Sequence, residues 1–268
     1  MKKLLKTIFT LIFLFIIFLS VKSLSTGGGV DDLLGLVFSK EKTDDMDKLY
    51  KNIEKHKDDN EKINWIYENF ANLSDKEIYL VGNDIDTSEF VYNLENKIWD
   101  FEYYPGESHN FNRKTPYFLQ WDNRWAYNIL GDSNIGFAGC GPTSMAMVLK
   151  RLNPDSDISP INIAQDANSY MGPDGIEWKF FEDEAHKYGH NIERISNNKK
   201  DIVDALDRGS LIVSVNKGNF TLFGHILVID SYKFGRFVIN DPNSIKNSKK
   251  TWSYGALEDQ IANIWLVY

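Results

Sequence analysis

The sequence contains a single cysteine, Cys140, so no internal disulfide can form and a disulfide scaffold is excluded. It also lacks an excess of positive charge, because 38 acidic residues outnumber 30 basic ones and give a formal net charge of −8 at pH 7. A nucleic-acid-binding protein needs a basic face to displace counterions from phosphates. The charge balance therefore argues against a nucleic-acid partner.

Motifs for cofactors and metals are missing as well. The sequence holds no phosphate-binding loop, no dinucleotide fingerprint and no His-Glu-x-x-His pattern. His186 and His190 lie four residues apart, but Gly189 is expected to end the helix between them, which favours a solvated helix end. We therefore expect neither a cofactor nor a metal ion.

Apolar residues, in contrast, are abundant. Hydrophobic residues make up 43% and aromatic residues 14% of the 268 positions. This is enough apolar surface for a packed core and excludes a disordered or collagen-like chain. The length allows one large domain, or a smaller domain with an N-terminal extension.

The N-terminus combines a basic stub with an apolar run. Lys2, Lys3 and Lys6 precede the uncharged segment from Thr7 to Val21. Since a spanning helix needs about 20 apolar residues, residues 1–24 are either a secretory signal peptide or a short membrane anchor. In both cases the lysines stay on the cytoplasmic side of the membrane and the rest of the chain is exported. We expect a cell-membrane protein with an extracellular catalytic domain, or a secreted one.

Residues 25–110 carry helical periodicity but no recognisable chemistry. A glycine-rich tether at 27–29 is followed by apolar residues at near-helical spacing between charged ones. These residues are Leu49, Ile53, Ile63, Ile66, Phe70 and Leu73. The pattern predicts a mostly helical extension that packs on the main domain, and the alternative is a spacer or a partner-binding module.

Chemistry concentrates around Cys140. The surrounding Gly139, Gly141 and Pro142 favour a sharp turn into a helix, with the proline in its first turn. Unpaired N–H groups and the helix dipole favour a thiolate at such a position. A lone cysteine is more often a small buried hydrophobe, but flanking glycines leave this sulfur approachable, and an unused thiol would be a liability in an oxidising space.

A nucleophilic thiol needs a base and a group that orients the base. His225 opens an apolar, β-branched segment that predicts a buried strand, and Asp241 follows another such segment just before Pro242. Adjacent antiparallel strands would bring imidazole and carboxylate together. Asn240 and Asp241 point to opposite faces if both are in the strand, and we assign Asp241 to the imidazole.

These motifs, in this order, resemble a known peptidase group. They are Gly139-Cys140-Gly141-Pro142-Thr143, Phe220-Thr221 with Gly224-His225, and Asn240-Asp241-Pro242-Asn243. Together with the segment at 116–122 they are similar to the double-glycine leader peptidases of bacteriocin exporters. More closely, they resemble the exported stand-alone relatives of these enzymes, the C39-like papain-fold proteins of Gram-positive bacteria.

The resemblance implies an α+β, papain-like cysteine peptidase fold over residues 111–268, in which a nucleophile helix packs on an antiparallel sheet. It also implies a glutamine that helps to hold the oxyanion. Gln120 matches the family's Pro-Tyr-x-x-Gln segment but lies 20 residues before Cys140. Asn134 has the spacing of shorter members, and both stay open, with Gln120 preferred.

The predicted function is that of a thiol peptidase or amide hydrolase. Cys140, His225 and Asp241 would form its triad, and its substrate would be a peptide or a cell-wall peptide. The alternatives are an acyltransferase that uses the same residues, and a non-hydrolytic surface protein of the same fold that binds peptides or wall components. We expect a monomer.

Overall fold

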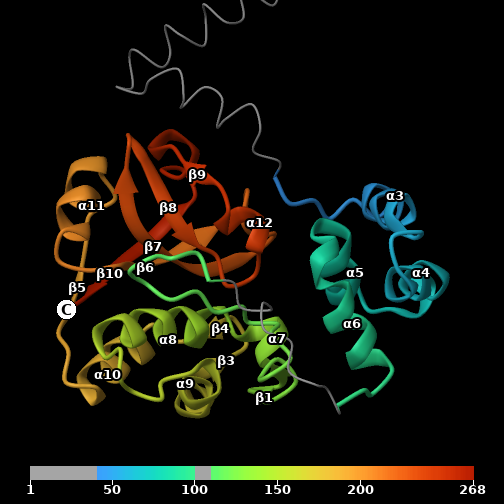
Figure 1. Cartoon of the computed structure of the whole chain (residues 1–268), viewed down its shortest axis with the longest axis horizontal. Coiled ribbons are helices and arrows are strands. Elements are labelled where there is room, and N and C mark those ends of the chain that lie inside the picture. The colour runs from blue at the N-terminus through green and yellow to red at the C-terminus, as the bar shows by residue number, and fades with distance from the viewer. Residues whose placement is uncertain (1–40, 100–109) are drawn as a thin grey trace, which may run out of the picture.

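The computed structural model describes residues 41–99 and 110–268. The predicted signal peptide or anchor lies outside these residues. Within them, no helix is both long and apolar enough to cross a membrane. The described chain divides into a helical region, residues 41–99, and a C-terminal region, residues 110–268, which lie beside each other in Figure 1.

The helical region contains four α-helices that pack their apolar sides together. Leu49 and Ile53 are fully buried, as the spacing in the sequence predicts. Side-chain oxygens of Asp45 and Asn60 accept hydrogen bonds from the first turns of the helices that follow them. The helices are α3 (Met46–His56), α4 (Glu61–Glu68), α5 (Asp75–Asn83) and α6 (Ser88–Glu95).

A six-stranded antiparallel sheet forms the centre of the C-terminal region, with strand order β5-β10-β6-β7-β8-β9. Strands β6, β7, β8 and β9 are neighbours in the sheet in the same order as in the chain, so that β7 lies between β6 and β8. The strands are β5 (Ile192–Arg194), β6 (Leu211–Asn216), β7 (Gly224–Lys233), β8 (Arg236–Asn240), β9 (Thr251–Trp252) and β10 (Ile261–Val267).

Both faces of the sheet are covered, which explains why its strands are continuous apolar runs rather than alternating ones. Ile226 and Val228 belong to the core on the side of the long helix α8, whereas Leu227 and Ile229 belong to a second core that includes Ile202. The helices of the C-terminal region are α7 (Ile135–Ala138), α8 (Cys140–Leu152), α9 (Pro160–Ala167), α10 (Lys179–Lys187), α11 (Lys199–Leu206) and α12 (Ile245–Ser248). Figure 1 shows α8, α9 and α10 below the sheet and α11 on its other side.

Two short hairpins complete the C-terminal region. Strands β1 (Ile129–Leu130) and β2 (Ser133–Asn134) pair just before α7. Strands β3 (Met171–Gly172) and β4 (Gly175–Ile176) pair between α9 and α10. The predicted fold is confirmed: a helix that begins at the cysteine packs on an antiparallel sheet, and a helical region precedes it.

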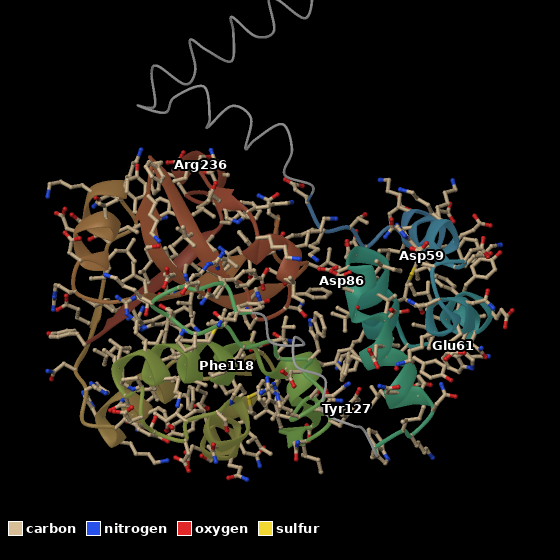
Figure 2. All side chains as sticks on the ribbon, viewed as in Figure 1. Asp59, Glu61, Asp86, Phe118, Tyr127 and Arg236 are labelled. Carbon is tan, nitrogen blue, oxygen red and sulfur yellow. The ribbon has the colours of Figure 1, made fainter. Side chains whose placement is uncertain are left out.

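The helical region is packed against the C-terminal region rather than tethered to it. Phe90 of α6 lies so close to Gly136 that a Cβ atom there would come within 2.3 Å of its ring. The same ring packs on Tyr127 and Phe137, with centroids 5.3 and 5.1 Å away. In Figure 2, Asp86 lies on the side of the helical region that faces the rest of the molecule, and Asp59 lies on the far side. The two regions therefore share one continuous core.

Candidate active site

Cys140 is the first residue of α8, as the glycine-proline pattern predicts. The preceding Gly139 is both the C-cap of α7 and the N-cap of α8. A side chain at this position would meet the carbonyl oxygen of Ile135 at 2.3 Å, so only glycine allows the two helices to meet at this angle. The cysteine side chain is half-buried and free of any disulfide. Its sulfur is therefore held at a helix N-terminus that remains accessible.

His225 and Asp241 form a buried pair beside this cysteine. The imidazole Nε2 lies 2.8 Å from Oδ1 of Asp241. His225 is the second residue of β7, and Asp241 follows the last residue of the neighbouring strand β8. The side chain of Cys140 hydrogen-bonds the same imidazole. The ring therefore bridges the thiol and the carboxylate, with Nε2 committed to Asp241.

The electrostatics of the three groups favour a charged pair. Burial alone would raise the pKa of Cys140, but the hydrogen bond and charge of His225, with the N–H groups of Ile226 and Gly141, lower this pKa below its usual range. Burial would lower the pKa of His225, but the charge and hydrogen bond of Asp241 and the thiol raise it to about 10. Burial would raise the pKa of Asp241, and His225 keeps it low. The directions of these shifts favour a thiolate beside an imidazolium.

Asp241 is fixed by groups from the segment that follows it. Its Oδ2 accepts a hydrogen bond from Nδ2 of Asn247 at 2.9 Å, and its Oδ1 accepts one from the N–H of Asn243 at 2.9 Å. The hydroxyl of Tyr117 donates to its carbonyl oxygen at 2.8 Å. A fully buried carboxylate requires such partners, because an unpaired one would be strongly destabilising. Several hydrogen bonds therefore fix the orientation of the Asp241 carboxylate toward His225.

The same hydrogen bonds extend to the helical region. Ser244 caps α12, the short helix that carries Asn247, by accepting a hydrogen bond from the Asn247 N–H. The Ser244 hydroxyl donates to Oδ2 of Asp84, directly after α5, at 2.6 Å. Both side chains are buried. A continuous path of hydrogen bonds thus runs from the helical region through α12 to Asp241.

The structure separates the two candidates for the oxyanion donor. Gln120 is buried and lines the same cleft as Cys140 and His225. Its Nε2 donates to the carbonyl oxygen of Gly136 at 2.8 Å and lies 3.5 Å from the carbonyl oxygen of Phe137. Asn134 instead caps α7, accepting from the N–H of Phe137 at 3.0 Å. Of the two, only Gln120 lies at the cleft.

A cleft of about 600 Å³ opens at the thiol. Cys140, Gln120 and His225 lie in its wall, as do the turns of the β1–β2 and β3–β4 hairpins and the loop before His225. The segment before α3 and the helix α5 also contribute to the lining. This volume is within the range of ordinary ligand sites.

The other candidates from the sequence lie elsewhere. His190 bonds Asn153, and α10 ends at Lys187, before Gly189 turns with a φ of +79°. Trp121 and Trp125 are buried in the core and do not line the cleft. Within residues 41–99 and 110–268, no cluster of three or more metal-binding side chains occurs.

Sequence reasoning missed the residues that support the site. Asn247 and Ser244 belong to the polar stretch after Asp241-Pro242-Asn243. A polar side chain soon after this turn could have been considered as a second hydrogen-bond partner of Asp241. No sequence signal pointed to α5, because its contribution depends on how the helical region docks.

Two solved structures are similar to this chain over about half of its length. The chain resembles the crystal structure of a double glycine motif protease from an AMS/PCAT transporter in complex with the leader peptide, at 18% identity over 52% of this chain and 88% of that one, with a TM-score of 0.36. It also resembles the peptidase domain of Streptococcus ComA, a bi-functional ABC transporter involved in quorum sensing. That match has 20% identity over 53% of this chain and 96% of the other, with a TM-score of 0.39.

A search among curated proteins gave no match. The model of the peptidase C39 like family, in contrast, matches residues 113–268, which is more than half of the sequence and includes Cys140, His225 and Asp241. The chain therefore belongs to the peptidase C39-like family.

Proposed function

We propose that the protein is a cysteine peptidase that hydrolyses amide bonds of peptides or cell-wall peptides outside the cytoplasm. The observation that carries this proposal is the alignment of a helix-terminal thiol, an imidazole and a buried carboxylate at an open cleft. Membership of a peptidase family supports the same chemistry. The apolar segment from Thr7 to Val21 supports the location.

In this mechanism the thiolate of Cys140 attacks the carbonyl carbon of the scissile amide. The proton held by the imidazolium of His225 passes to the leaving nitrogen as the C–N bond breaks, which leaves a thioester. His225 then takes a proton from water, and the hydroxide formed attacks the thioester carbonyl and releases the thiol. Asp241 keeps Nε2 protonated and oriented, so that Nδ1 is the nitrogen that exchanges the proton.

The oxyanion that forms during each attack needs donors near Cys140. The N–H of Cys140 lies in the first turn of α8, where N–H groups have no acceptor within their own helix. Nε2 of Gln120 would be the second donor, since it lines the cleft and carries two hydrogens. In serine proteases, each such donor stabilises the transition state by about 2.7–4 kcal/mol.

The proposal is tested by incubating the protein with a mixed library of soluble peptides and wall-derived peptides, and by finding new termini with mass spectrometry. We expect cleavage by the untreated protein and none after iodoacetamide has alkylated Cys140. Cleavage that survives complete alkylation contradicts the proposal. If the added amine glycinamide is joined to the new carboxyl ends, the reaction is acyl transfer; binding without any cleavage indicates a non-hydrolytic role.

Asn247 gives a second prediction, because it holds the oxygen of Asp241 that does not face His225. Replacing it, as Asn247→Ala, removes a hydrogen bond to a charged group, which is worth about 1.5–3 kcal/mol. We expect kcat to fall about 10- to 100-fold if this loss appears in the transition state. Steady-state kinetics would measure it, with the exposed Asn191→Ala as control. An unchanged kcat in a folded Asn247→Ala protein would mean that Asp241 does not need this anchor.

A further inference from the structure

The active-site cleft is formed by both regions of the chain. From the helical region, Lys42 and four residues of α5, Lys76, Tyr79, Leu80 and Asn83, line the cleft that contains Cys140. The family match begins at residue 113, so this wall lies outside the part of the chain that defines the family. Helix α5 therefore adds side chains to the cleft that the matched part of the chain does not contain.

We propose that α5 is the specificity-determining wall of the cleft and that it selects peptides with an acidic side chain, which Lys76 and Lys42 would bind. The inference rests on the proposed function for its biological meaning, because it names the class of peptide that the same cleft receives. It concerns peptide binding, which can be measured separately from hydrolysis.

The wall is held firmly in place. Asn83, at the end of α5, exchanges two hydrogen bonds of 2.8 Å with the backbone of Thr43. The N–H of Lys42 donates to the carbonyl oxygen of Gly218 at 3.0 Å, and Asp84 accepts the hydrogen bond from Ser244. These contacts tie the start and the end of the wall to the strands and loops that carry the catalytic residues. A preorganised wall of this kind loses little conformational entropy when a ligand binds.

Charge distribution on the wall favours an acidic ligand. Lys76 is exposed and Lys42 is half-buried. Neither ammonium group forms an ion pair with a carboxylate of residues 41–99 or 110–268. Two such cations at one cleft stand out in a chain with a net charge of −8. The acidic residue of the lining, Asp132, belongs to the β1–β2 hairpin of the C-terminal region.

An aromatic pair provides the apolar part of the same wall. The Tyr79 ring lies 6.5 Å from that of Phe223, which precedes His225 by two residues and is 78% exposed. Both residues line the cleft, so these rings are available to the apolar part of a ligand. Tyr79 and Phe223 would cover the apolar part of a bound peptide, while the lysines bind its carboxylate.

The test uses Cys140→Ala protein, so that peptides bind without being cleaved. The probes are ten-residue fluorescent peptides with glutamate, glutamine or lysine at each scanned position, and anisotropy gives the dissociation constants. We expect the glutamate peptides to bind best at one or two positions. Adding Lys76→Glu should weaken them about five- to tenfold and improve the lysine peptides, because attraction becomes repulsion.

Lys51→Glu is the matched control, since it makes the same charge change at an exposed position of α3 that does not line the cleft. The proposal is overturned if Lys76→Glu and Lys51→Glu give the same peptide preference, or if no peptide binds. If binding shows the predicted preference but the unsubstituted protein hydrolyses no peptide, the proposed function fails and the wall remains a peptide-selecting surface.

Discussion

Replacing Cys140 with alanine is expected to abolish hydrolysis, with kcat falling about 10⁴- to 10⁶-fold, as is found when a covalent nucleophile is removed. The sulfur is the only group of the triad that can bond to the substrate carbonyl, and His225 and Asp241 act through it. The residual rate would come from the oxyanion donors and from substrate binding alone. Cleavage of the best library peptide, followed by chromatography, gives the measurement.

The fold should survive this change. Cys140 is half-buried at a helix end, and alanine has a higher helix propensity than cysteine. Circular dichroism and thermal melting of the Cys140→Ala protein serve as the control. A folded Cys140→Ala protein that cleaves peptides at the original rate would show that the thiol is not the nucleophile.

Replacing His225 with glutamine should lower kcat about 10⁴-fold, because glutamine can donate a hydrogen bond to Asp241 but cannot exchange a proton with the thiol or the leaving group. Glutamine also preserves polar contact with the buried carboxylate, which alanine would leave unpaired. Kinetics with the same peptide measure the loss. A folded His225→Gln protein with near-normal activity would exclude the imidazole as the acid and base.

The same substitution should change the pH dependence of alkylation. In the unsubstituted protein the pKa of Cys140 lies below its usual range because of His225, so iodoacetamide should react quickly at mildly acidic pH. The charged pair persists as pH rises until the imidazolium loses its proton near pH 10. Without the imidazolium, burial raises the pKa of the thiol, and rapid alkylation should begin only at alkaline pH. Identical pH profiles would mean that His225 does not control the thiolate.

The support for the triad extends beyond the part of the chain that matches the family. Asp241 depends on Asn247, Asn247 belongs to a turn capped by Ser244, and Ser244 bonds Asp84 of the helical region. Docking of the helical region and orientation of the triad are therefore physically linked. In this structure the helical region packs against the C-terminal region and takes part in the hydrogen bonds behind Asp241.

The sequence alone indicated the candidate residues that the structure brings together, because their signals are local. A glycine-flanked cysteine before a proline predicts a helix start whatever surrounds it, and the structure begins α8 at that residue. Alternation along a strand allowed only one of Asn240 and Asp241 to face His225. The structure places Asp241 there, whereas the side chain of Asn240 donates to the backbone of Thr115 and Pro116. The spacing of apolar residues within residues 25–110 likewise predicted helices with one buried face, and the helices of residues 41–99 have such a face.

Only the tertiary structure could decide between Gln120 and Asn134, since both spacings were compatible with the sequence. The β1–β2 hairpin and α7 lie between Gln120 and Cys140 in the chain and bring both residues to the same cleft. Asn134 instead caps a helix. Asn247, Ser244 and the α5 wall also depend on docking between segments up to 160 residues apart. Such contacts arise from the packing of whole surfaces, which local pattern does not encode. Sequence thus determined which side chains are candidates for the chemistry, and the fold decided what holds them and what surrounds the cleft beside them.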